Sequence, residues 1–294
     1  MTGAGLLRVA SVNMNYGGID ADGSAGRWQA LTGFVREQEP DVLLCQEMAA
    51  HKPSGLQRHL LDTARSLGMT PAALGPPAPG AASGSEHHTA VLVRPGLDVA
   101  DTGPATAYRP WDHVPWAEAL LVVPGLPFPL RVYSVHLPHS SDVWQKHFAN
   151  KLASRVAARA EAGEQALAAG DWNCLAPGDA YTQEQLAAMP ARVRPARLRL
   201  LPGCTWEPVL DVHQVLAAVG LTDIAASLPP ERRDPPDLAP TGTAGGRVDR
   251  AYAPPVIASA VTACRQARTP ATDHAALLLT ISITKAVGIP GAPV

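Results

Sequence analysis

The chain has 294 residues, enough for one large two-sheet domain or two small domains, and 46% of them are hydrophobic, enough for a sizeable core. Its formal net charge of −2 lacks the basic excess typical of proteins that hold long DNA through phosphate contacts, so any nucleic-acid contact has to be local. Its four cysteines include no CxxC pair, which favours free thiols over a zinc knuckle or a disulfide framework.

The first half of the chain alternates short apolar segments with helical ones. Residues 27–39 space their apolar side chains like a helix that stops at Pro40, whereas DVLLC at 41–45 is typical of a buried strand. The elements predicted up to residue 137 are, in chain order, strand 6–14, helix 27–39, strand 41–45, helix 55–67, a loop over 71–86, and strands 89–94, 117–123 and 130–137.

The second half begins with a long amphipathic segment that predicts a helix. The predicted elements are helix 142–162, strand 166–169, an irregular segment over 174–208, helix 211–219, a Pro/Gly-rich loop over 228–246, and closing strands 248–252 and 275–283. Neither an internal repeat nor a clear linker is evident. We therefore expect residues 1–285 to form a single domain and residues 286–294 a loose C-terminal tail.

Targeting and membrane segments are not evident either. The N-terminal stretch MTGAGLLRVASVNMN lacks a charged segment followed by a long apolar run, and no run of 18 apolar residues occurs. We expect a cytoplasmic protein without stable membrane insertion. The oligomeric state does not follow from the sequence.

Polar residues recur at the ends of the predicted apolar strands. They are Asn13, Glu47, His136, Asp171, Asn173, Asp249, Asp273 and His274. Burying such groups without partners costs free energy, and a core strand does not need them at its end. A shared site at one rim of the sheets explains all of them together.

The residue types suit the metal-assisted hydrolysis of a phosphate ester. Oxygen ligands such as Glu47, Asp273 and the Asn13 amide favour Mg²⁺ or Mn²⁺ over zinc. Such an ion would neutralise a phosphate and stabilise the charge that develops on the leaving oxygen. A histidine oriented by a carboxylate, as His274 by Asp249, is suited to act as a base or electrostatic partner.

The motifs VNMN, QE, YSVHL, GDWN, RVDRAY and TDHAAL occur in this order over residues 6–283 and together resemble the endonuclease/exonuclease/phosphatase superfamily, which includes pancreatic-type deoxyribonuclease. The resemblance implies an α/β fold, a four-layer α/β/β/α sandwich of two mixed β-sheets flanked by helices. It also implies a divalent-metal-dependent hydrolase of phosphate esters, most simply a phosphodiesterase or nuclease that uses in-line attack by water.

The same resemblance implies a role for each residue near the metal. Glu47 would be the main ligand, Asn13 would lie beside the ion, and Asp273 would help to hold it.

Five further residues would carry the chemistry. By resemblance, Asp171 would position or activate the nucleophilic water and Asn173 would bind the phosphate. His136 would assist at the scissile phosphate or the leaving group, and Asp249 would orient His274. The substrate does not transfer with the fold.

Other interpretations stay open at this point. Each strand-end residue, taken alone, could instead be a turn former, a helix cap or a core residue with satisfied hydrogen bonds. The chain could be a small-molecule or lipid phosphatase or phosphodiesterase on the same fold, or a catalytically silent binding module. A zinc hydrolase could use His87, His88, His113 and His139, although one of these histidines lining the substrate cleft is the simpler interpretation.

Two further clusters also have alternative interpretations. Four arginines could grip a polyanion or form a solvated loop: Arg192, Arg194, Arg197 and Arg199. Three tryptophans could stack on bases or fill the core: Trp111, Trp116 and Trp206.

Overall fold

The computed structural model describes residues 5–20, 22–48, 55–76, 87–102, 114–235 and 238–287. The strands in these ranges form two large sheets and a short hairpin. One sheet has seven strands, in the order β12 (Arg233–Asp234), β14 (Val261–Ala267), β15 (Ala276–Ser282), β1 (Leu6–Asn13), β2 (Val42–Met48), β4 (His88–Val93) and β3 (Thr70–Leu74). The other has six, in the order β11 (Thr222–Asp223), β13 (Asp249–Ala253), β8 (Gln165–Asp171), β7 (Leu130–His136), β6 (Trp116–Val122) and β5 (Asp98–Asp101).

Each large sheet mixes parallel and antiparallel pairs. β1 runs parallel to β2 and antiparallel to β15, whereas β7 runs parallel to β8 and antiparallel to β6. The crossover that each parallel pair requires contains a helix, α1 (Gly26–Gln38) between β1 and β2 and α3 (Asp142–Glu161) between β7 and β8. The two helices agree closely with the predicted segments 27–39 and 142–162.

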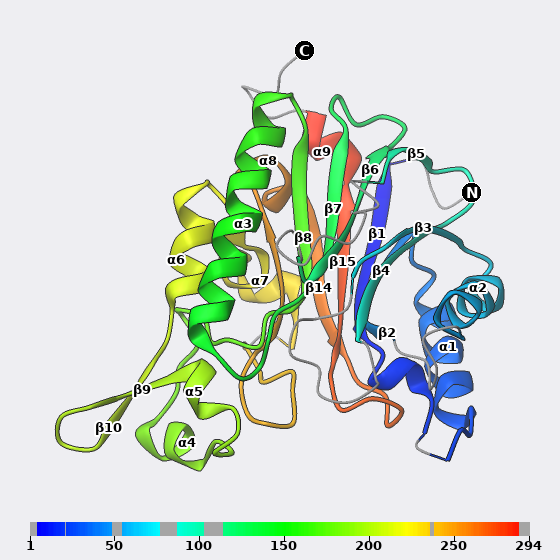
Figure 1. The fold of residues 1–294 in the computed structure, drawn as a ribbon. Coiled ribbons are helices and arrows are strands. Elements are labelled where there is room, and N and C mark those ends of the chain that lie inside the picture. The colour runs from blue at the N-terminus through cyan, green and yellow to red at the C-terminus, as the bar shows by residue number, and fades with distance from the viewer. Residues whose placement is uncertain are drawn as a thin grey trace.

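The sheets pack face to face, and helices cover their outer faces (Figure 1). The central core joins side chains from both sheets, such as Leu44 from one and Leu167 from the other. A second apolar cluster lies between the seven-stranded sheet and the helices α1 and α2 (Leu56–Leu67), and a third lies between the six-stranded sheet and the helices α3 and α6 (Asp211–Ala218). The predicted four-layer α/β/β/α sandwich of two mixed sheets is therefore confirmed.

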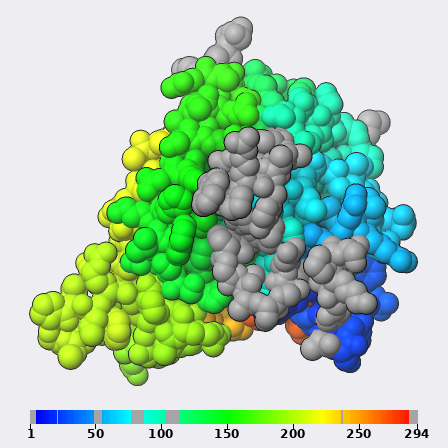
Figure 2. All heavy atoms as spheres, in the orientation of Figure 1, coloured from blue at the N-terminus to red at the C-terminus, as the bar shows by residue number. Residues whose placement is uncertain are grey.

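The segment 174–208 is more regular than predicted. It contains the helices and strands α4 (Gln183–Ala188), α5 (Arg194–Arg197), β9 (Leu198–Leu201) and β10 (Thr205–Pro208). These elements have four to six residues, too few to show a hydrophobic period in the sequence. A small apolar cluster of their own holds them together, and Figure 2 shows this lime-green part of the chain protruding from the rest of the molecule.

Several short elements were also missed. They are β3 and β12 in segments predicted to be loops, β14, β5, β11, α7 (Ile224–Ser227), α8 (Pro255–Ala258) and the 3-10 helices η1 (Tyr16–Gly18) and η4 (Pro230–Arg232). The register of β14 shifts between Val261 and Ala263, which breaks the alternation that marks a strand. The helix α9 (Ile283–Val287) extends two residues into the segment predicted to be a loose tail, and residues 288–294 lie outside the described residues.

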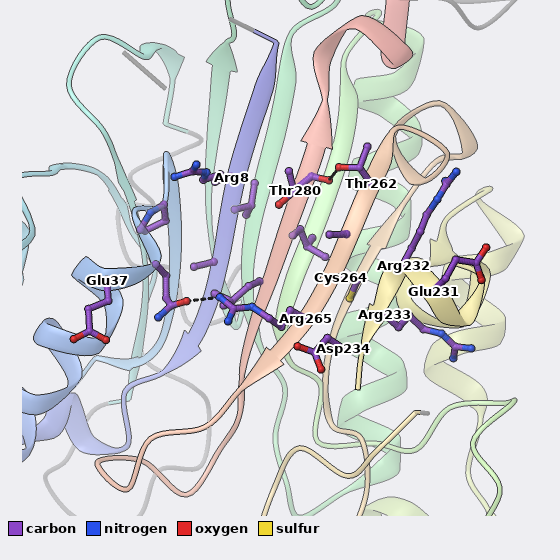
Figure 3. A pocket seen from close by; sticks show the side chains of 17 residues that line it. Arg8, Glu37, Glu231, Arg232, Arg233, Asp234, Thr262, Cys264, Arg265 and Thr280 are labelled. Atoms are coloured by element: carbon purple, nitrogen blue, oxygen red, sulfur yellow. Dashed lines mark hydrogen bonds between the residues drawn. The ribbon is translucent and has the colours of Figure 1, made fainter. Parts of the chain in front are cut away.

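A groove of about 360 Å³ lies on the seven-stranded sheet between α1 and the β12 edge (Figure 3). Its arginines point apart in this view, and Arg265 bonds to Gln38 at the groove wall. Carboxylates from Glu37, Glu231 and Asp234 lie among them, so the lining has no dominant charge. None of the predicted site residues lines this groove.

Two predictions about the chain can be checked directly. All four cysteines are free thiols, and three of them are buried. Among the described residues, no helix has the length and apolar character needed to cross a membrane.

Candidate functional site

The polar strand ends meet at one cleft of about 530 Å³. Six of the eight predicted residues line it, namely Glu47, His136, Asp171, Asn173, Asp273 and His274. The other two lie directly behind this lining, where Asn13 bonds to Glu47 and Asp249 bonds to His274. The structure thus brings all eight side chains together.

Strand register explains the arrangement on the six-stranded sheet. His136 is the last residue of β7 and lies opposite Asp171, the last residue of the parallel strand β8. On the other side of β8, the antiparallel strand β13 begins with Asp249, also opposite Asp171. Three predicted residues are therefore neighbours across three adjacent strands.

Glu47 is directed into the cleft by an irregularity in β2. The register between β2 and β4 shifts between Cys45 and Met48, and Glu47 has a φ of 53°. A bulge of this kind turns a side chain away from the direction that strand alternation would give it. Non-glycine residues with positive φ are uncommon and cluster at functional sites.

The Glu47 carboxylate lies between two histidines. Its Oε2 is 3.2 Å from Nδ1 of His87, and its Oε1 is 3.8 Å from Nε2 of His136. Burial by itself would raise the pKa of Glu47. The hydrogen bond from His87 and the nearby charge of His136 outweigh burial and hold the pKa well below its ordinary value. Glu47 is therefore ionised at neutral pH.

Asn13 connects the carboxylates of the two sheets. Its Oδ1 accepts a hydrogen bond from the Asn15 N–H at 2.9 Å. Because this bond occupies the oxygen, its Nδ2 faces the cleft side and donates to Glu47 Oε1 at 3.1 Å and Asp171 Oδ2 at 3.3 Å. Asn15 in turn donates to Asp273 Oδ1 at 2.9 Å.

His274 is held by two carboxylates. Its Nδ1 lies 2.8 Å from Asp249 Oδ2, and its Nε2 lies 3.7 Å from Asp171 Oδ2. Burial would lower the pKa of His274, but the charges of Asp249 and Asp171 raise the pKa to about 10. Burial also raises the pKa of Asp171, which the charge of His274 offsets only in part. The site thus pairs an imidazolium with a buried carboxyl group.

Asn173 is fixed from several sides. Its N–H donates to Asp171 Oδ1 at 2.9 Å and its Nδ2 donates to the Leu137 carbonyl at 2.9 Å. Arg197, which is 3% exposed, donates to the Asn173 side-chain oxygen at 3.3 Å, and Gln145 donates to its carbonyl at 2.9 Å. The side chain of Asn173 therefore has little freedom to move.

The four arginines do not act as one group. Arg197 is buried at the cleft, whereas Arg192 is exposed at its rim. Arg194 instead donates to two carbonyls near the end of α4 and lies 5.5 Å over the ring of Trp206. Arg199 is exposed on the hairpin. Only two of the four line the cleft, and whether they grip a polyanion stays a prediction.

The histidines and tryptophans with more than one interpretation in the sequence also occupy different places in the structure. His87 and His139 line the cleft, which confirms that one of these histidines does so. His88 is buried and bonds to the Gly75 carbonyl at 2.8 Å. Trp116 fills the core beside α3. His113 and Trp111 lie outside the described residues.

Two groups of side chains in the described residues could hold a metal ion. One consists of Glu47, His87 and His136, and the other of Asp171, Asp249 and His274; within each group the donor atoms lie within 4.8 Å of one another. The sequence had indicated Glu47 as a ligand but not its pairing with His87. The adjacent histidines His87 and His88 follow a segment rich in Pro, Gly, Ala and Ser, and no periodic context there assigns either of them a partner.

Comparisons with known proteins identify the family and the fold. Residues 10–274 match the sequence model of the Endonuclease/Exonuclease/phosphatase family. An AP endonuclease from Archaeoglobus fulgidus is similar with a TM-score of 0.63 and 16% identity, over 94% of this chain and 99% of that chain. An endonuclease/exonuclease/phosphatase from Bacteroides vulgatus is similar with a TM-score of 0.64 and 13% identity, over 94% and 98%.

A third similar structure is a 3' phosphatase from Neisseria bound to a product DNA hairpin. Its TM-score is 0.60 at 16% identity, over 94% of this chain and 99% of that chain. At these identities the likeness establishes a shared fold. None of the curated proteins has a sequence that matches the chain.

Proposed function

We propose that this chain, which belongs to the endonuclease/exonuclease/phosphatase family, is a divalent-metal-dependent phosphodiesterase or nuclease. Phosphoester hydrolysis is the reaction of the family. The observation that supports metal-dependent chemistry here is that Glu47, Asp171 and Asp273 line one cleft, with Asp249 behind it bonded to His274. Three carboxyl groups at one cleft would repel an anionic phosphate unless a cation lay between them.

The donor chemistry is compatible with a divalent ion. Glu47 is ionised and lies at the cleft wall, so it would hold the ion, as the sequence predicted. Asp273, which also lines the cleft, would contribute a second oxygen. Asn13 would act by orienting Glu47, because its amide nitrogen, which cannot bind a cation, faces that carboxylate. The bound ion would neutralise the phosphate and stabilise the leaving oxygen. From the sequence it is predicted to be Mg²⁺ or Mn²⁺.

The remaining residues would transfer the proton of the attacking water and bind the phosphate. Asp171 is buried and has a raised pKa, so it would accept a proton from the attacking water more readily than an exposed aspartate. His274, kept protonated by Asp249, would stabilise the negative charge on a phosphate oxygen. Asn173 would hold a phosphate oxygen at the cleft, and His136 would assist the leaving group.

Nucleic acid is the substrate class we favour. The support is Arg192, which is exposed at the cleft rim where the continuation of a polynucleotide would pass. A compact phosphomonoester or lipid headgroup would make no use of it. The location in the cytoplasm and the single domain over residues 1–285 stay predictions.

A metal-supplemented activity panel tests this function. The substrates are plasmid DNA, single-stranded DNA, RNA, a chromogenic phosphodiester, inositol phosphates and sphingomyelin, each with Mg²⁺, Mn²⁺ or Zn²⁺. Asp171→Asn is the control, because it keeps the shape of the side chain and removes the base. Metal-dependent cleavage of a nucleic acid that Asp171→Asn abolishes supports the proposal. Cleavage of inositol phosphates or sphingomyelin but not of nucleic acid would show that the substrate is a small molecule or a lipid. Absence of any hydrolysis would favour a catalytically silent binding module.

A further inference from the structure

The donor set around Glu47 differs from the one that the sequence predicted. The sequence indicated Glu47, Asp273 and the Asn13 amide, all of them oxygen ligands. In the structure the Asn13 oxygen accepts a hydrogen bond from the Asn15 N–H and its amide nitrogen faces Glu47, so the donor atoms close to Glu47 are imidazole nitrogens of His87 and His136. The group with donor atoms within 4.8 Å of one another is therefore one carboxylate and two histidines.

Two of the separations are close to those between neighbouring ligands of one small ion. Two ligands on an ion with bonds of about 2.1 Å lie about 3.4 Å apart in a tetrahedral site and about 3.0 Å apart in an octahedral one. The distances from the Glu47 oxygens are 3.2 Å to His87 Nδ1 and 3.8 Å to His136 Nε2. One donor atom from each of the three side chains lies within 4.8 Å of the other two.

Tyr16 holds two members of the group in place from outside. The rings of His87 and His136 themselves lie 6.2 Å apart with an interplanar angle of 31°. Tyr16 packs edge-on against His87 with ring centroids 4.6 Å apart, and the Tyr16 N–H lies 3.4 Å from Glu47 Oε2. The side chains of Glu47 and His87 are both 16% exposed, at the wall of the open cleft. The group therefore has an entry path for an ion and room for substrate beside it.

Ligand type decides which ion such a group selects. Imidazole nitrogen suits zinc and other transition metals, whereas Mg²⁺ prefers oxygen and keeps most of its water. Two histidines with one glutamate, plus an open position, is a ligand set of catalytic zinc sites. The second group is a weaker candidate, because Asp249 does not line the cleft and already pairs with His274 at 2.8 Å.

We propose that Glu47, His87 and His136 form a metal site that selects a first-row transition-metal dication over Mg²⁺, with Zn²⁺ bound more tightly than Mn²⁺. The proposal rests on the proposed function and deepens it by naming the ion class and a third ligand, His87. It changes the part assigned to His136, which becomes a ligand. It also reverses the preference expected from the sequence, which was for Mg²⁺ or Mn²⁺ over zinc.

Direct metal binding tests the site without relying on activity. The full chain is dialysed against a chelator and titrated with Zn²⁺, Mn²⁺ or Mg²⁺ in a calorimeter, and with Co²⁺ while its visible absorption is recorded. The test variant is His87→Ala. The matched control is His139→Ala, because His139 lines the same cleft but is not part of the group. Denaturant unfolding of both variants shows whether they remain folded.

We expect one Zn²⁺ per chain, bound at least about 100-fold more tightly than Mg²⁺. His87→Ala should weaken Zn²⁺ by about 10- to 100-fold or more and alter the Co²⁺ spectrum, while Mg²⁺ affinity hardly changes. His139→Ala should bind Zn²⁺ within about twofold of the unmodified chain, since it removes no ligand. If His87→Ala does not fold, His87→Gln replaces it, because glutamine has a similar length and no imidazole.

The outcomes separate this inference from the proposed function. Unchanged Zn²⁺ binding in His87→Ala, or Zn²⁺ bound no more tightly than Mg²⁺, overturns the inference even if Mg²⁺ supports hydrolysis. Loss of Zn²⁺ affinity in His87→Ala but not in His139→Ala supports the site. If the metal-binding result supports the site and no phosphate ester is hydrolysed with any ion, the proposed function fails and the metal site stands.

Discussion

Replacing Gly170 by alanine should damage both the fold and the site, because no side chain has room at this position. A Cβ on Gly170 would lie 1.9 Å from the Val135 carbonyl oxygen, about 1.5 Å closer than ordinary contact, which begins at 3.4 Å. The obstacle is backbone of the adjacent strand β7, with which β8 pairs along its whole length. The two strands would have to separate where His136 and Asp171 end them.

The size of the effect follows from two contributions. Gly170 has a φ of +155°, a conformation that residues with a side chain rarely adopt and that costs about 1–3 kcal/mol. Overpacking against a strand adds about 1–3 kcal/mol. Together we expect a loss of about 2–6 kcal/mol in the free energy of unfolding, a large part of the 5–15 kcal/mol typical of a domain.

Gly163→Ala is the matched control. Gly163 also has positive φ, +83°, and lies just before the same strand, but a Cβ there would meet no atom within 4 Å. It should cost only the conformational strain of about 1–2 kcal/mol. Urea unfolding followed by circular dichroism measures both variants. Folded Gly170→Ala should also lose about 100-fold in activity, because a displacement of about 1 Å can cost that much. Coincident unfolding midpoints for the two variants would refute the clash argument.

Three further predictions concern the site. Chelation should abolish activity. Glu47→Gln removes the charged ligand and should therefore raise the metal concentration needed for half-maximal activity by at least about tenfold. Full activity in metal-free protein would contradict the metal requirement. In chelated protein the NMR titration of His274 should give a pKa near 10, and Asp249→Asn should lower it. The pKa of His274 in the folded state is above the ordinary value of about 6.5. The stability that the pairing with Asp249 provides is therefore complete below about pH 6.5 and is lost as the pH rises through about 10. Titration of His274 near about 6.5 in the unmodified chain would show that the pairing is absent. Arg192→Gln should weaken binding of a polynucleotide and reduce its salt dependence, whereas Arg199→Gln, on the exposed hairpin, should not; equal effects from both would mean that Arg192 is not a specific contact.

The sequence predicted most of the site because its residues follow strands that are easy to recognise. DVLLC before Gln46 and Glu47 is a short apolar run with a polar end, and ALAAG before Asp171 is another. Such runs place their last residues at one edge of a sheet. The order of the motifs along the chain gave the resemblance to the endonuclease/exonuclease/phosphatase superfamily. The layers followed from the alternation of apolar runs with amphipathic segments.

The parts that were missed depend on contacts that periodicity does not encode. His87 precedes β4 directly, and its position beside Glu47 results from how β4 pairs with β2. The orientation of the Asn13 amide is decided by a backbone N–H two residues away. The hairpin of β9 and β10 is stabilised by a local cluster that includes Leu186 and Leu198. Each of these features is tertiary or a matter of single hydrogen bonds.

The site straddles the two sheets, so its geometry depends on how they pack. Glu47 belongs to the seven-stranded sheet, whereas Asp171 belongs to the six-stranded one, and the Asn13 amide bonds to both. Near this bridge, Gln46 Nε2 donates to Ser134 Oγ at 3.0 Å, and Ser134 Oγ donates to the Cys45 carbonyl at 2.7 Å, and all three residues are buried. Because buried hydrogen bonds between sheets tolerate little displacement, a core substitution that shifts one sheet also separates the two halves of the site. Activity should therefore be more sensitive than stability to packing changes beneath the cleft, since chemistry requires sub-ångström placement that folding does not.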